Sequence, residues 1–65
     1  MIINKIQELR QNIRITQKEL AAKIGVTRQT IISLEKNKYI PSLEMGFKVS
    51  RFFNLNIEEV FSYSE

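Results

Sequence analysis

The chain has 65 residues, a net charge of +3, and neither cysteine nor histidine. This length predicts a single folded domain over residues 1–65. The missing residue types exclude disulfides, thiol chemistry, zinc sites built on Cys or His, and catalytic triads that need an imidazole. We therefore expect no enzyme activity, no metal site and no cofactor. The modest basic excess permits a nucleic-acid partner without requiring one.

No hydrophobic run approaches the ~20 residues of a membrane-spanning helix. The first four residues, MIIN, also lack the basic leader and the long apolar region of a signal peptide. We therefore expect a cytoplasmic protein with no membrane partner. No part of the sequence suggests a pocket for a small-molecule ligand.

The chain begins with a short apolar, partly β-branched segment, residues 1–3, which is typical of a strand. Asn4 and Gln7 then form N-x-x-Q, a capping-box pattern that predicts a helix from residue 4 to about residue 12 or 13. The apolar residues of this segment recur at intervals of three and four, which predicts one buried stripe. They are Ile6, Leu9 and Ile13.

The next segment predicts two short helices separated by a tight turn. Thr16 and Glu19 form a capping box at the start of the first helix. Gly25 permits the left-handed backbone that ends it, and Thr27 caps a second helix over residues 27–36. The pattern predicts a helix-turn-helix, and the alternative is an ordinary helical hairpin within a bundle.

The segment after this unit, residues 36–41, loses helical periodicity and is rich in hydrogen-bond donors. It is either a solvated surface loop or a segment that contacts phosphate. Ser42 then caps a fourth helix. We expect the inner face of that helix to consist mainly of Leu43, Phe47, Val49, Ser50 and Phe53. Gly46 lies inside this helix and suggests close packing, with Phe47 filling the volume nearby.

A short fifth helix is predicted over residues 57–60, because Asn56 and Glu59 form another capping box. The tail, residues 61–64, alternates apolar and polar side chains, so it can pair as a strand with residues 1–3. The predicted fold class is all-α with five helices, together with a small two-stranded antiparallel sheet that joins the N- and C-termini.

These segments resemble the Xre/Cro, or lambda-repressor-like, helix-turn-helix family over nearly the whole chain. The motifs that carry the resemblance are Ile6-x-x-Leu9-Arg10, Thr16-Gln17-x-Glu19-Leu20-Ala21, Ile24-Gly25-Val26, Ile31-x-x-Leu34-Glu35, Pro41-Ser42-Leu43 and Leu55-x-Ile57-x-x-Val60-Phe61. Within the family, the MIIN start, the aromatic tail and the segment 28–31 resemble short stand-alone bacterial regulators of the cytolysin-repressor type. The chain departs from the family pattern at Gly46 and Ser50, where alanine is usual.

The resemblance implies that the helix over residues 27–36 enters the major groove of double-stranded DNA. Arg28 has the fork that matches guanine, and Gln29 can bond adenine. The expected base-contacting residues are Thr27, Arg28, Gln29, Ile32 and Ser33. The expected phosphate-contacting residues are Gln17, Thr30, Lys36, Asn37, Lys38 and Tyr39. Gln17 is also expected to orient Gln29.

The family also implies two structural roles. Arg10 and Glu35 occupy positions that commonly pair, which predicts a structural ion pair between the first helix and the end of the third. A homodimer is expected, because one module contacts few base pairs. The predicted interface residues are Leu55, Ile57, Val60 and Phe61. For Leu55 and Phe61, the alternative of simply closing the core is favoured.

The function predicted from the sequence is a sequence-specific DNA-binding transcriptional regulator. It would act as a repressor that binds an inverted-repeat operator as a homodimer, although activation stays open. The alternative is a protein-interaction module of the antitoxin or anti-repressor type that uses the same fold.

Overall fold

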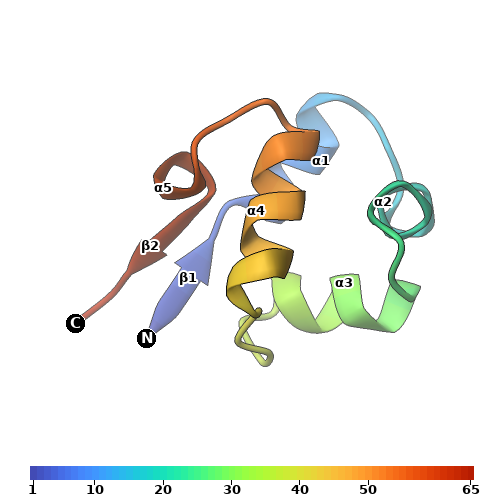
Figure 1. Cartoon of the computed structure of the whole chain (residues 1–65). Coiled ribbons are helices and arrows are strands. Elements are labelled where there is room, and N and C mark those ends of the chain that lie inside the picture. The colour runs from blue at the N-terminus through green and yellow to red at the C-terminus, as the bar shows by residue number, and fades with distance from the viewer.

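The computed structural model describes all residues 1–65 as five helices and one small sheet. The elements in chain order are β1 (Ile2–Asn4), α1 (Ile6–Asn12), α2 (Gln17–Ile24), α3 (Arg28–Glu35), α4 (Leu43–Phe52), α5 (Ile57–Val60) and β2 (Phe61–Tyr63). In Figure 1, α3 lies at the bottom of the molecule, with α2 at one end of it and α4 above the other end. The predicted five-helix fold with a small sheet is confirmed. No helix has the length and apolar character needed to cross a membrane.

The sheet joins the two ends of the chain. β1 and β2 pair in antiparallel register, with Ile2 opposite Tyr63 and Asn4 opposite Phe61. The Ser64 N–H extends the ladder by donating to the Met1 carbonyl at 2.7 Å. The two termini therefore lie side by side (Figure 1), as the sequence predicted.

The start of α1 differs from the prediction. Asn4 belongs to β1, and α1 begins at Ile6 without a side-chain capping bond from its N-cap residue, Lys5. The reason is that pairing with Phe61 draws Asn4 into the sheet. Its side-chain oxygen still accepts a hydrogen bond from the Ile6 N–H at 3.0 Å.

The two helices of the helix-turn-helix begin and end as the sequence predicted. Thr16 and Glu19 make both bonds of the capping box of α2. Gly25 ends that helix with φ +87°, a left-handed conformation that glycine adopts without steric cost. The Thr27 hydroxyl then accepts from the Thr30 N–H and caps α3. Strong local signals therefore fix this part of the chain.

Three other helices end at a non-glycine residue in the left-handed region. Arg14, Asn37 and Asn54 each have φ +58°. In each case the following residue donates its N–H to a carbonyl five positions earlier, at 3.0–3.2 Å, which is the hydrogen bond of a Schellman motif. Asparagine tolerates this conformation, whereas arginine adopts it only at a steric cost. The backbone at Arg14 is therefore strained.

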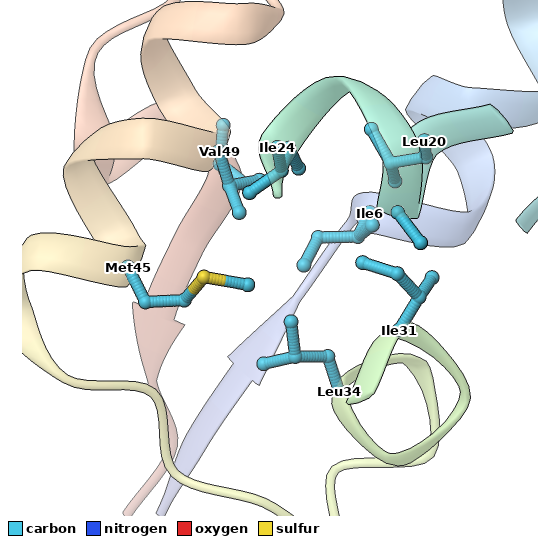
Figure 2. Close-up of a cluster of buried hydrophobic side chains, with 9 residues drawn as sticks. Ile6, Leu20, Ile24, Ile31, Leu34, Met45 and Val49 are labelled. Atoms are coloured by element: carbon cyan, nitrogen blue, oxygen red, sulfur yellow. The ribbon is translucent and has the colours of Figure 1, made fainter. Parts of the chain in front are cut away.

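The core lies where α1, α2, α3 and α4 meet. Figure 2 shows its central side chains pointing toward one another. The nine buried apolar residues are Ile6, Leu20, Ala21, Ile24, Ile31, Leu34, Met45, Val49 and Val60. Because all five helices contribute to this single cluster, α3 is held rigidly from behind while its other side stays exposed.

The predicted inner face of α4 was partly wrong. Leu43 is 72% exposed and Phe47 is 48% exposed, whereas Met45 and Val49 enter the core. Val49 and Ser50 are buried as expected, and Phe53 is half-buried. The apolar residues of α4 exceed what one core face can bury, so periodicity alone did not identify which of them face inward.

Gly46 allows α5 and β2 to pack closely on α4. A Cβ atom built at Gly46 would lie 3.0 Å from the Ile57 Cδ1 atom and 3.8 Å from the Phe61 ring. The volume beside Gly46 is thus filled by these two side chains, and the expectation that Phe47 fills it was wrong. The buried Ser50 hydroxyl donates to the Gly46 carbonyl at 2.8 Å, so it carries no unsatisfied polar atom.

Candidate nucleic-acid interface

The first turn of α3 presents two exposed side chains with long polar ends. Arg28 and Gln29 are both exposed, directly after the capping residue Thr27. The Thr27 hydroxyl lies 3.0 Å from the Thr30 hydroxyl and 3.2 Å from the Thr30 N–H, so the two threonines brace this turn. The Arg28 and Gln29 donors are therefore available to an external partner on a fixed backbone.

The second turn of α3 continues the same surface toward the following loop. Ile32 and Ser33 are partly exposed. A shallow groove brings this surface together with the loop, and its lining residues are Thr27, Gln29, Thr30, Ser33, Lys38 and Tyr39. Three predicted contact residues of α3 and its capping residue Thr27 thus adjoin two from the loop. Lys36 and Asn37 are exposed in the same loop but do not line this groove.

A second groove lies on the other side of the α3 N-terminus, where the chain enters α2. We call it the cationic groove, and it is formed mainly by Arg14, Lys18, Arg28 and Gln17, with no carboxylate in its lining. The free N–H groups at the start of α2 add partial positive charge at its edge. The groove can attract an anion such as a backbone phosphate.

The sequence prediction missed Arg14 and Lys18 as members of this surface. Both are exposed, and both flank the Thr16–Glu19 capping box in the sequence. Basic residues on either side of a predicted helix N-terminus were the available signal. The structure contains only two ion pairs, Arg10–Glu35 and Lys48–Glu44. Arg10, which also lines the cationic groove, is thus paired, whereas Arg14, Lys18 and Arg28 of the groove have no ion-pair partner in the chain. The same holds for Lys36 and Lys38 of the loop after α3.

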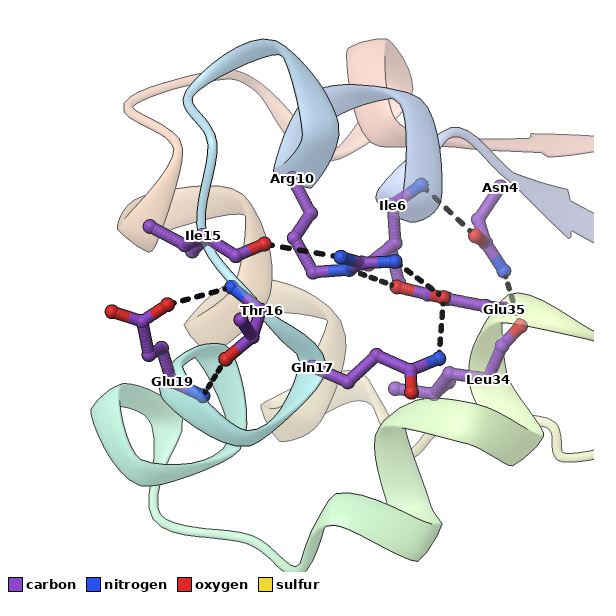
Figure 3. Close-up of polar contacts among 9 residues, drawn as sticks. All are labelled: Asn4, Ile6, Arg10, Ile15, Thr16, Gln17, Glu19, Leu34 and Glu35. Carbon is purple, nitrogen blue, oxygen red and sulfur yellow. Dashed lines mark hydrogen bonds and ion pairs between the residues drawn. The ribbon is translucent and has the colours of Figure 1, made fainter.

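Beneath this surface, the partly buried Gln17 joins Arg10 and Glu35 in a polar cluster (Figure 3). We call it the buried polar cluster, because its ion pair is withdrawn from solvent. The Arg10 Nε atom donates to Glu35 Oε2 at 2.7 Å, and its Nη2 atom donates to Glu35 Oε1 at 3.2 Å. The Arg10 Nη1 atom donates to the Ile15 carbonyl at 3.0 Å. The Arg10 and Glu35 side chains are only 11% and 4% exposed. One guanidinium thus connects α1, the chain before α2, and the end of α3.

Gln17 occupies a different place from the one expected. Its Nε2 atom donates to Glu35 Oε1 at 3.0 Å, and no hydrogen bond joins it to Gln29. The expectation that Gln17 orients Gln29 is therefore not met in this structure, because the carboxylate of Glu35 is the stronger acceptor within reach. Gln17 still lines the cationic groove with one N–H and its carbonyl oxygen unbonded.

The comparisons with known proteins agree with this arrangement. A family model described as helix-turn-helix matches residues 6–60. The chain belongs to this helix-turn-helix family. An uncharacterised HTH-type transcriptional regulator of Methanocaldococcus jannaschii is 48% identical and is matched over 95% of this chain and 94% of its own. The phage CTXφ transcriptional repressor RstR of Vibrio cholerae is 37% identical over 100% of this chain and 59% of its own.

A solved structure also has the fold of this helix-turn-helix protein. The crystal structure of a candidate DNA-binding protein from Bacteroides fragilis superposes with a TM-score of 0.83 at 29% identity, over 95% of this chain and 100% of that one. The Xre/Cro resemblance is thereby confirmed, and the chain is a helix-turn-helix transcriptional regulator. The M. jannaschii relative is archaeal, so the resemblance is not confined to bacterial regulators.

The apolar surface of the helix-turn-helix protein lies away from α3, around α5 and the start of α4. Ile57 and Phe61 are partly exposed and line a shallow depression with Ile2, Pro41 and Leu43. Val60 is only 1% exposed, so it closes the core of the chain and offers almost no surface to a second copy. Leu55 packs against the core, which agrees with the core-closing role favoured for it from the sequence.

Two exposed residues at this depression were missed by the sequence prediction. Leu43 lines it and is 72% exposed, and Ile40, which directly precedes Pro41 in the chain, is 77% exposed. These values are higher than those of the other large apolar side chains. We call Ile40, Leu43, Ile57 and Phe61 the apolar face. Their exposure could not be read from the sequence, because Leu43 fits the helical pattern of a core residue.

Proposed function

We propose that this protein is a homodimeric repressor that binds an inverted-repeat operator through α3. The observation that carries the proposal is the first turn of α3, where the exposed side chains of Arg28 and Gln29 stand between two surfaces with unpaired positive charge. An α-helix presented in this way fits the major groove of B-DNA.

Base recognition is assigned to the exposed face of α3. Arg28 would donate two hydrogen bonds to guanine, and Gln29 would pair with adenine, each worth about 1–3 kcal/mol of discrimination against a wrong base. Thr27, Ile32 and Ser33 would contribute lesser contacts, with the Ile32 side chain placed against a thymine methyl group.

Phosphate contacts are assigned to the two sides of α3. On one side, the cationic groove offers Arg14, Lys18 and the unbonded N–H of Gln17. On the other side, the loop offers Lys38 and Tyr39 beside Thr30, with Lys36 and Asn37 next to them. Contacts on both sides would fix the angle at which α3 enters the groove, and they carry no sequence information directly.

Dimerisation is assigned to the apolar face. Ile40 and Leu43 leave most of their side chains in water, at a hydrophobic cost that a second copy of the chain would remove. A two-fold pair reads two half-sites about one helical turn apart, which gives the inverted-repeat operator. Repression then follows from occupancy of a promoter, and the name of RstR supports this sign of regulation.

The DNA-binding part is tested by selecting ligands from a random duplex pool and measuring affinity across salt concentrations. We expect an inverted repeat to be selected, and Arg28→Ala and Gln29→Ala to lose its discrimination from random duplex. Arg51→Ala is the matched control, because Arg51 is an exposed arginine at the far end of α4 from α3. Weak binding to every sequence that vanishes with salt would refute the proposal and favour a protein-interaction module.

The dimer is tested by sedimentation of Leu43→Glu. This change places a charge on the apolar face without entering the core, so we expect a folded monomer with reduced operator affinity. Ile13→Glu is the control, because Ile13 is 52% exposed on a different surface. A Leu43→Glu protein that stays dimeric would exclude the apolar face as the interface.

The sign of regulation is tested by transcription in vitro from a promoter that overlaps the selected operator. We expect RNA synthesis to fall as the operator fills, and to recover with Arg28→Ala. A rise in RNA synthesis would identify an activator instead.

A further inference from the structure

We infer that Asn4 is a positioning residue for the loop over residues 36–39, and that it thereby sets how the phosphate-contacting side chains of this loop meet DNA. The inference rests on the proposed function for its DNA readout. Its structural part, that Asn4 orders the loop, can be tested without DNA.

The Asn4 side chain uses both of its N–H donors and one lone pair of its oxygen. Its Nδ2 atom donates to the Leu34 carbonyl at 2.8 Å and to the Asn37 Oδ1 atom at 3.2 Å. Its Oδ1 atom accepts from the Ile6 N–H at 3.0 Å. Figure 3 shows the two bonds to Ile6 and Leu34, which run from β1 to the beginning of α1 and to the end of α3. Residues about 30 positions apart are thus joined by one amide.

The two hydrogen bonds donated by Asn4 end on the Schellman motif that terminates α3. Asn37 has φ +58°, its N–H donates to the Leu34 carbonyl at 3.0 Å, and the Lys38 N–H donates to the Ser33 carbonyl at 3.0 Å. Asn4 therefore holds both the carbonyl and the side chain of the turn at which the chain leaves α3.

The loop has little else to hold it. Residues 36–40 are all exposed. The bond from Asn4 to Asn37 is the only side-chain hydrogen bond that reaches residues 36–41. Lys36, Lys38 and Tyr39 are therefore oriented by the local backbone turn and by Asn4. A looser loop would lose ordering entropy each time that it bound a phosphate.

Asn4 also connects the loop to the sheet that joins the two termini. Asn4 lies opposite Phe61 in the sheet, and Phe61 belongs to the apolar face. One residue thus adjoins both the surface assigned to dimerisation and the surface assigned to phosphate, so a disturbed sheet edge would also release the loop.

The test is Asn4→Ser. The serine hydroxyl can still accept from the Ile6 N–H, but it is too short to reach Leu34 and Asn37, and the charge is unchanged. We expect hydrogen exchange at the amides of Asn37 and Lys38 to accelerate about tenfold, while exchange at Leu20 and Ile31 in the core is unaltered. Asn56→Ser is the matched control, because it makes the same substitution at the start of another helix.

The DNA readout uses a double-mutant cycle. We expect Asn4→Ser to lower affinity for the selected duplex about five- to tenfold and to reduce its salt dependence. In the background of Lys36→Ala with Lys38→Ala, the same change should have less than about a twofold effect, because the loop has lost both of its charged phosphate contacts. A general loss of folding would lower affinity equally in both backgrounds and would overturn the inference.

The two proposals can fail separately. Unaltered exchange at Asn37 and Lys38 in Asn4→Ser would refute the positioning role, whatever the protein binds. Accelerated exchange in a protein that selects no duplex would leave Asn4 as the residue that orders the loop and would refute the proposed function instead.

Discussion

Two neighbouring regions use the same chemical groups for opposite purposes. In the buried polar cluster, the guanidinium of Arg10 donates hydrogen bonds to the Glu35 carboxylate and to the Ile15 carbonyl. In the cationic groove above it, Arg28 is exposed and has no ion-pair partner in the chain. A charged residue that is paired and buried fixes the fold, whereas an exposed one without a partner is available for recognition. Gln17 belongs to both regions, since it bonds Glu35 and also lines the groove.

The largest effect is expected from breaking the buried polar cluster. Arg10→Met leaves the Glu35 carboxylate buried without its counter-charge, so we expect stability to fall by about 3–5 kcal/mol in urea denaturation. Replacing both partners, as Arg10→Met with Glu35→Leu, should recover much of that loss. A single variant with the wild-type midpoint would show that the cluster contributes little to the fold.

A smaller effect is expected at Gln17, which lies in both regions. Gln17→Ala removes one hydrogen bond to the Glu35 carboxylate but leaves both Arg10 bonds, so the loss should be about 1–2 kcal/mol. If Gln17 also contacts phosphate, the same variant will bind all duplexes more weakly and with a shallower salt dependence. Lost stability with unchanged DNA affinity would assign Gln17 to the buried polar cluster alone.

A third variant should separate stability from DNA binding. Arg14→Gly relieves the strained backbone at φ +58°, so thermal melting should show a gain of up to about 1 kcal/mol. It also removes a charge from the cationic groove, so the salt slope of DNA binding should fall by about one. Asn54→Gly is the matched control, since it changes a residue with the same φ at the end of α4. Equal effects of both variants on DNA affinity would exclude Arg14 from the phosphate surface.

The smallest effect on stability is expected at the capping box of α2, whose Thr16 lines the cationic groove. The Thr16 backbone N–H donates to the Glu19 carboxylate at 2.8 Å, and this bond, with a further one involving the Thr16 side chain, lowers the pKa of Glu19 from 4.5. The stabilisation is therefore present above pH 4.5 and is lost as the pH falls through the lowered pKa. Glu19→Gln cannot titrate, so its melting temperature should lie below that of the wild type at neutral pH and approach it in acid. A constant difference across pH would show that ionisation of Glu19 does not matter.

Local sequence signals were enough to predict several elements of the fold. The Thr16–Glu19 box, Gly25 and Thr27 specify where α2 and α3 begin and end, because capping bonds and left-handed turns depend on residues only a few positions apart. The same local signals placed Arg28 and Gln29 in the first turn of α3, and the pattern of the two ends predicted their pairing as a sheet.

Features that depend on residues distant in the sequence became visible only in the folded chain. The tertiary structure turned Leu43 and Phe47 outward, buried Val60, and brought Arg14 and Lys18 into one groove with Arg28. It also placed Asn4 in β1 and bonded its side chain to the Leu34 carbonyl at the end of α3, whereas the sequence predicted that Asn4 caps the first helix. The cause is physical, since the same local pattern is compatible with a side chain that faces the core or the solvent. Which orientation is adopted depends on the element that packs against the side chain, and that element lies elsewhere in the chain.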